Sequence, residues 1–136
     1  MADLILRGDA VTVRQVTTLT PTAANAALYD LLVNGKTTDG YTSDASGTVQ
    51  EIVEGLKAAL DANAKAIPEI DEITFTEIDT ALIATGRSDG QPFTLAEGPG
   101  SGNFASITTG TAAKSPNHWI AENFTGGVLP GAGDNV

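Results

Sequence analysis

His118 is the only histidine in the chain, and histidine is the side chain that most readily serves as a general base near neutral pH. A nucleophilic triad needs that base beside a serine or threonine and an orienting carboxylate. His118 instead adjoins Trp119 in a segment rich in glycine and proline. The pattern favours a packing role for this pair, and it predicts no nucleophilic active site.

Carboxylates are numerous, and two groups stand close together in sequence: Glu69, Asp71 and Glu72, and Glu77 with Asp79. A glycosidase holds two carboxyl groups at a set separation in a cleft, which usually also carries aromatic platforms for the sugar. The chain has only one Trp, two Tyr and four Phe. We therefore expect these carboxylates to be solvated or to form ion pairs, and we expect no catalytic residue.

Two turns carry the hard oxygen ligands that calcium prefers, at Asp39-Gly40 with Asp44 and at Ser88-Asp89-Gly90. Neither has the spacing of an EF-hand loop. Aspartates in such turns commonly accept hydrogen bonds from the backbone two residues on. The sequence predicts ordinary turns at both places, with no metal and no cofactor.

Three short motifs add little chemistry. The tripeptide at 7–9 (Arg-Gly-Asp) is short enough to occur by chance. The glycosylation pattern at 123–125 (Asn-Phe-Thr) matters only in a secretory pathway, for which we find no signal. The glycine-rich stretch at 98–102 lacks the Lys-Ser/Thr and helix of a phosphate loop. None of them predicts an enzyme.

Net charge narrows the choice of partner. Seven Lys or Arg face seventeen Asp or Glu, which gives a formal charge of −10 and a pI near 4.2. A binder of nucleic acid or of an anionic membrane surface needs clustered basic residues. With no cysteine, disulfides, thiolate metal sites and a cysteine nucleophile are excluded. We expect neither a nucleic acid nor a membrane as partner.

Chain length and hydropathy favour one soluble domain. A chain of 136 residues suits a single domain, or a small domain with tails. We find no secretory signal, and no stretch approaches the roughly 20 apolar residues of a membrane span. We expect synthesis in a cytoplasm.

The elements that must position these side chains are mostly strands. Eighteen threonines lie largely in short alternating runs, a pattern typical of pleated strands. We expect a strand at 11–19, with a bulge and an end at Pro21, and strands at 27–33 and 36–43. Asn34-Gly35 between the last two predicts a hairpin turn.

One amphipathic helix is expected at about 48–63. Thr48 and Glu51 form a capping-box pattern at its start, and Pro68 prevents its continuation. Apolar residues at a spacing of three and four form one stripe, which is more often a core face than a docking surface: Val49, Ile52, Val53, Leu56, Ala59 and Leu60.

Further strands are expected at 73–78, 80–85, 92–96 and 104–109, with a turn at 86–90 and a turn-rich break at 97–102. The predicted fold class is α+β and mainly β. A mostly antiparallel sheet of about six or seven short strands carries the helix across one face, and the termini are extended. A small sandwich with the helix closing one end is the alternative.

Three regions follow from this order: an N-terminal strand or arm at 1–20, a compact β-α-β domain at 21–110, and an extended Gly/Pro-rich tail at 111–136. We expect the arm and the tail to contact partners, because an open strand edge accepts a neighbour's strand. The candidate partner-binding residues are Val11, Val13, Val16, His118, Trp119 and Phe124.

Two segments carry a resemblance to a known family. The shared pattern over Leu28–Leu95 is Asn-Gly-Lys at 34–36, Tyr-Thr-Ser-Asp at 41–44, Val-x-x-Ile-Val-x-Gly-Leu-x-Ala-Ala-Leu at 49–60, Pro-Glu-Ile at 68–70 and Asp-Gly-x-Pro-Phe-Thr at 89–94. This stretch resembles a small β-α-β module of phage and prophage virion proteins. Segment 116–136 is similar to the opening segment of β-solenoids in phage structural proteins and bacterial adhesins. That family usually has Trp in place of Phe124, and its repeated strands are absent from this sequence.

The resemblance implies a non-enzymatic virion structural protein, such as a capsid decoration or head-fibre protein. It would oligomerise, with a trimer expected, and attach to the capsid exterior through the major capsid protein or another virion protein. A tail-tube or tail-fibre component is one alternative. Another is a bacterial surface adhesin or carbohydrate-binding module, for which Tyr29, Tyr41 and Trp119 are the aromatic candidates.

Overall fold

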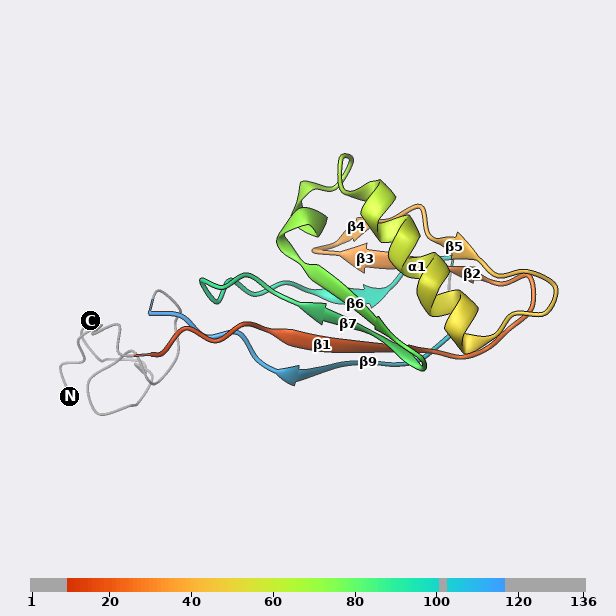
Figure 1. Ribbon diagram of the computed structural model, residues 1–136. Helices are drawn as coiled ribbons and strands as arrows, with labels where there is room; N and C mark the ends of the chain where they lie inside the picture. Colours follow the sequence, from red (N-terminus) through yellow and green to blue (C-terminus); the bar gives the residue numbers. More distant parts are fainter. Residues whose placement is uncertain (1–9, 101–102, 117–136) are drawn as a thin grey trace, which may run out of the picture.

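The computed structural model describes residues 10–100 and 103–116 (Figure 1). It is mainly β, with one α-helix and antiparallel sheets, as the sequence predicts. The helix α1 spans Val49–Asn63, and a short 3₁₀ helix, η1, spans Pro68–Glu72. The strands are β1 (Val16–Pro21), β2 (Leu28–Tyr29), β3 (Leu31–Val33), β4 (Lys36–Thr37), β5 (Tyr41–Thr42), β6 (Thr74–Ile78), β7 (Ala81–Thr85), β8 (Leu95–Glu97) and β9 (Phe104–Thr111).

These strands form three sheets rather than the single expected sheet. The largest has four antiparallel strands in the order β6-β7-β1-β9. A three-stranded sheet has the order β4-β3-β8, and β2 pairs with β5. Helix α1 contacts β6, β7 and β1 of the large sheet and also β5 (Figure 1). The helix therefore lies against one face of the large sheet.

The core fills the space between α1 and the sheets. The apolar stripe predicted for the helix is its core face, since Ile52, Val53, Leu56 and Leu60 are all buried. Large-sheet residues that alternate toward the helix complete this face of the core: Leu19, Phe75, Leu82 and Ala84. Buried side chains of the smaller sheets and connections join them: Tyr29, Leu31, Val33, Ile67, Ile70, Ile73 and Phe93.

The predicted capping box is present at the start of α1. The Thr48 hydroxyl accepts from the Glu51 backbone amide at 3.2 Å, and the Glu51 carboxylate accepts from the Thr48 amide at 3.2 Å. Two of the free N–H groups at the helix start are thereby satisfied. At the other end, the Asn63 side-chain amide donates to the Ala59 carbonyl at 2.8 Å, and the helix stops before Pro68.

The predicted Asn-Gly hairpin is also confirmed. Asn34 and Gly35 have φ values of 49° and 80°, the positive pair that a type I′ turn requires, and β3 pairs with β4 across them. Two predicted strands are nevertheless split. Segment 27–33 breaks at buried Asp30, and segment 36–43 breaks before Gly40, which has a φ of 75°. The described residues therefore contain nine short strands instead of six or seven.

Strand β1 sits inside the large sheet, with β7 on one side and β9 on the other. Strand β1 ends at Pro21, as predicted. The two register shifts in its pairing with β9 lie at Val16/Thr17 and at Thr20/Pro21, and the extra residue at each shift belongs to β9. They are not the bulge predicted between Val13 and Val16, because β1 begins only at Val16. The predicted region boundaries at 20/21 and 110/111 fall inside β1 and β9, respectively. Val16–Thr20, the end of the predicted N-terminal strand or arm, is consequently part of the large sheet.

Strand β8 begins later than predicted because the backbone N–H and C=O of Phe93 form hydrogen bonds with a side chain instead of with a neighbouring strand. The Phe93 amide donates to Gln15 Oε1 at 3.1 Å, and the Phe93 carbonyl accepts from Gln15 Nε2 at 2.8 Å. Buried Gln15 thus takes the place of a neighbouring strand at this point. Strand β9, in contrast, continues two residues past the predicted end, to Thr111.

Candidate functional site

The face of the large sheet that points away from α1 carries no charged side chain. We name it the threonine face and define it by the residues that alternate with the core positions. Its members are Val16, Thr18, Thr20, Thr74, Thr76, Ile78, Ala81, Ile83, Thr85, Ser106 and Thr108.

Strand register aligns these side chains into rows. The central row runs Thr76, Ile83, Thr18 and Thr108, one residue from each strand. Thr76 and Thr108 at the two ends of this row are exposed, and the two inner members are half-buried. Ile78 at the margin keeps 48% of its surface exposed. The face is therefore open to solvent, rich in β-branched side chains, and uncharged in a chain of charge −10.

Strand β9 forms one edge of this sheet. It pairs with β1 alone among the described residues. Strand β8 contacts the start of β9, where the Phe104 amide donates to Glu97 Oε1 at 2.8 Å, so backbone N–H and C=O groups without a strand partner are offered only beyond Phe104. Its eight residues include no charge and no proline, two devices that commonly block edge pairing. Bulge-type register shifts near both ends leave Ser106–Thr109 as the regular stretch. The opposite edge strand, β6, carries Glu77 and is followed by Asp79.

The sequence-predicted partner residues are only partly described. Val11 is 75% exposed. Val13 exchanges two backbone hydrogen bonds with Lys114, at 2.9 and 3.0 Å, which joins the segments before β1 and after β9. Val16 is paired on both sides and belongs to the threonine face. His118, Trp119 and Phe124 lie outside the described residues.

The two tyrosines proposed as sugar platforms are engaged in the fold. Tyr29 is fully buried, its hydroxyl donates to the Thr22 carbonyl at 2.5 Å, and its ring meets Phe104 edge-on at 5.8 Å. The half-buried Tyr41 donates a hydrogen bond to Glu51. This bond raises the pKa of Tyr41 to about 12 and lowers that of Glu51. Neither ring is free to stack on a sugar.

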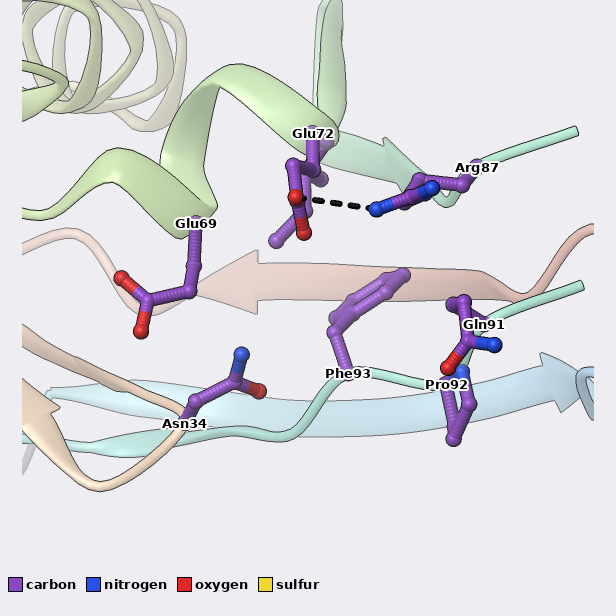
Figure 2. Close-up of a pocket in the computed structure, with 8 residues that line it drawn as sticks. Asn34, Glu69, Glu72, Arg87, Gln91, Pro92 and Phe93 are labelled. Carbon is purple, nitrogen blue, oxygen red and sulfur yellow. Dashed lines mark hydrogen bonds and ion pairs between the residues drawn. The ribbon is translucent and has the colours of Figure 1, made fainter. Parts of the chain in front are cut away.

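A small cleft lies between η1 and the segment that follows β7 (Figure 2). The cleft has a volume of about 20 Å³, which is close to the volume that one water molecule needs. Its charged side chains form ion pairs, and among the described residues Glu69 Oε2 is buried without a hydrogen-bond partner. Figure 2 shows Arg87 in an ion pair with Glu72, at 3.0 Å. The lining residues are Asn34, Glu69, Glu72, Ile73, Arg87, Gln91, Pro92 and Phe93.

An ion pair holds the Glu69 carboxylate of the cleft in its charged form. Lys36 donates to Glu69 at 2.5 Å, and this hydrogen bond lowers the pKa of Glu69. Arg87 also contacts Asp89 at 2.6 Å, and the hydrogen bond to Asp89 raises the pKa of Arg87. A general acid needs a raised carboxyl pKa, the opposite of the shift at Glu69. These contacts tie η1 to the β3–β4 hairpin and to the loop after β7.

The turns considered for calcium use their aspartates locally. Asp44 Oδ1 accepts from the Ser46 amide at 2.7 Å, and Asp89 Oδ1 accepts from the Gln91 amide at 3.2 Å. Both contacts are Asx turns, as the sequence predicts. Within residues 10–100 and 103–116, no group of three or more His, Cys, Asp or Glu side chains is arranged to hold a metal ion.

Sequence reasoning missed the threonine face, although its signal is visible afterwards. The pattern Thr-x-Thr or Ser-x-Thr recurs with an apolar residue between, at Thr18-Leu-Thr20, Thr74-Phe-Thr76 and Ser106-Ile-Thr108. Each repeat sends its apolar residue to the core and its hydroxyls outward. Their union into one surface depends on pairing between segments far apart in the chain.

Comparison of the sequence with family models and with curated proteins identified no relative of this chain. No family model matches the chain, and the curated proteins yield no significant match. In the part of the chain that the structure describes, no helix is long and apolar enough to cross a membrane.

Proposed function

We propose that this chain is a non-enzymatic structural protein of a phage virion, a capsid decoration or head-fibre protein. It attaches to the capsid exterior through the major capsid protein or another virion protein. The threonine face carries the proposal, because it is a partly exposed surface without charge on a strongly acidic chain. The sequence resemblance over Leu28–Leu95 supplies the virion setting.

The composition of the face suits contact with another protein. Burying a charge at an interface is costly unless it is paired, and interface cores are depleted of charged residues. Threonine and isoleucine also lose little rotamer freedom on contact, since β-branched side chains are stiff at χ1. A partner can therefore cover this face without stripping water from any carboxylate.

The extent of the face sets the strength of the contact. Four strands at about 4.8 Å spacing and five residues at about 3.3 Å each cover roughly 300 Å². A standard interface buries about 800 Å² on each partner. One copy on this face alone would bind weakly, which suits a shell that presents many equivalent positions and gains avidity from multivalency.

The acidic charge fits an exterior position. Glu51, Glu54 and Asp61 lie on α1, on the other side of the sheet from the threonine face. Like charges displayed on the outward side favour solubility and keep neighbouring copies apart. Packaged DNA would repel them, so a position inside the capsid is unfavourable.

Particle association tests the proposal. The chain should be found by mass spectrometry in virions purified from the lysate of the phage or prophage that encodes it. Added to particles that lack it, the recombinant chain should co-sediment with them. Thr76→Asp places an unpaired charge on the threonine face and should weaken this binding at least tenfold.

A matched charge elsewhere separates the face from a general effect. Ala58→Asp lies on the exposed side of α1 and should bind particles like the unaltered chain. Absence of the chain from virions, with no binding to particles, overturns the proposed function. Equal binding by Thr76→Asp and Ala58→Asp overturns the role of the face.

A further inference from the structure

We infer that two copies of this chain pair through β9, antiparallel and across a two-fold axis perpendicular to the sheet. This inference rests on the proposed function and concerns the edge of the sheet that carries the threonine face. The two four-stranded sheets become one sheet of eight strands. Both threonine faces then lie on one side, and both α1 helices lie on the other.

Backbone chemistry provides the first argument. The outer side of β9 offers N–H and C=O groups with no strand partner in the described ranges, and β-augmentation satisfies such groups in register. The regular stretch Ser106–Thr109 lies between the two register shifts with β1. Symmetric antiparallel pairing within this stretch puts Ile107 or Thr108 on the two-fold axis, opposite its own copy.

Charge identifies the occupant as a second copy. Two chains of charge −10 repel, so they approach closely only where neither presents a carboxylate. No Asp, Glu, Lys or Arg occurs between Glu97 and Lys114, and β9 lies within that interval. The Glu97 carboxylate accepts from the Phe104 amide at 2.8 Å, at the start of β9 and outside the regular stretch Ser106–Thr109. The other edge, β6, would instead bring Glu77 of each copy toward the other, and like charges across a strand pair are destabilising.

The burial of side chains on β9 also supports pairing at this edge. Phe104 and Ile107 of β9 pack against the core but remain only half-buried, because the core ends at this strand. A strand added beyond β9 would cover them and remove more apolar surface from water.

The dimer also extends the attachment surface. Joining two threonine faces edge to edge doubles the continuous area to about 600 Å², nearer to the 800 Å² per partner of a standard interface. A shell would therefore hold a pair of copies more firmly than either copy alone.

Light scattering after size exclusion, at several concentrations, tests the pairing. The unaltered chain should approach twice 13.9 kDa as concentration rises. Thr108→Asp sets like charges across the axis and should raise the dimer dissociation constant at least tenfold. Ala58→Asp on the exposed side of α1 is the matched control and should dimerise normally. Circular dichroism confirms that each variant is folded.

Cysteine cross-linking provides a second measurement, and the chain contains no native cysteine to interfere. Ile107→Cys or Thr108→Cys should form a disulfide-linked dimer under mild oxidation, and Thr76→Cys should not. A monomer at all concentrations, a trimer, or a dimer indifferent to Thr108→Asp overturns the pairing. A monomer found in virions refutes the pairing alone, and a dimer absent from virions refutes the proposed function alone.

Discussion

Replacing Gly55 by alanine should destabilise the protein, although the same change in an exposed helix interior usually stabilises. Gly55 lies within α1, where the ring of Tyr41 covers it. A Cβ at this position would be 2.3 Å from Tyr41 Cε2 and 2.4 Å from Cζ, well inside van der Waals contact. The ring cannot easily swing aside, because its hydroxyl is hydrogen-bonded to Glu51 one turn earlier.

The two opposing effects can be estimated. Alanine is favoured over glycine in a helix interior by about 1 kcal/mol. Overpacking at a filled contact costs about 1–3 kcal/mol. The balance for Gly55→Ala is a loss of about 1 kcal/mol. When Tyr41→Ala first removes the ring, the clash is gone and the same Gly55→Ala change should gain about 1 kcal/mol.

Urea and thermal unfolding of the four chains in this double-mutant cycle measure the difference. The single variant Gly55→Ala should melt about 4 °C lower than the unaltered chain. Ala58→Gly on the exposed side of α1 calibrates helix propensity and should cost about 1 kcal/mol. If Gly55→Ala stabilises the unaltered chain, or acts equally with and without the Tyr41 ring, the reasoning is refuted.

Three further changes test other contacts. Gln15→Ala removes the two hydrogen bonds to Phe93 and should cost about 2–4 kcal/mol in urea unfolding; a loss below about 1 kcal/mol would contradict this. Gly98→Ala puts a Cβ 2.3 Å from Asp30 Cγ and should cost about 1–3 kcal/mol, whereas an unchanged melting temperature would show that the loop yields freely. The folded protein holds the Tyr41 proton more tightly than the unfolded chain, so stability should fall as pH rises from 10 toward 12. Tyr41→Phe should reduce this fall to the part that Tyr29, whose pKa is also raised, contributes; an identical pH profile in the variant would count against the Tyr41–Glu51 contact.

Short sequence patterns were sufficient to predict the elements that form through contacts between residues close in the chain. The capping residues Thr48 and Glu51 and the stripe through Leu56 define α1, because a helix is built from contacts within a few residues. Asn34-Gly35 likewise defines its hairpin, because positive φ at both positions selects the turn. The mainly β class follows from the alternating threonine-rich segments.

Long-range contacts decided what those patterns could not. Buried Asp30, packed against Gly98, interrupts a segment that alternates like one strand, and Gln15 replaces a strand partner at Phe93, 78 residues away. The candidate site depends most on such contacts. Charge and composition led us to expect neither a nucleic acid nor a membrane as partner. Only the pairing of β1 with β7 and β9, and of β7 with β6, gathers three distant Thr/Ser-x-Thr repeats on one face. Alternation with a period of two residues predicts which side chains of one strand point the same way. The pairing register of the strands in the folded protein determines which of those side chains meet on one face of the sheet.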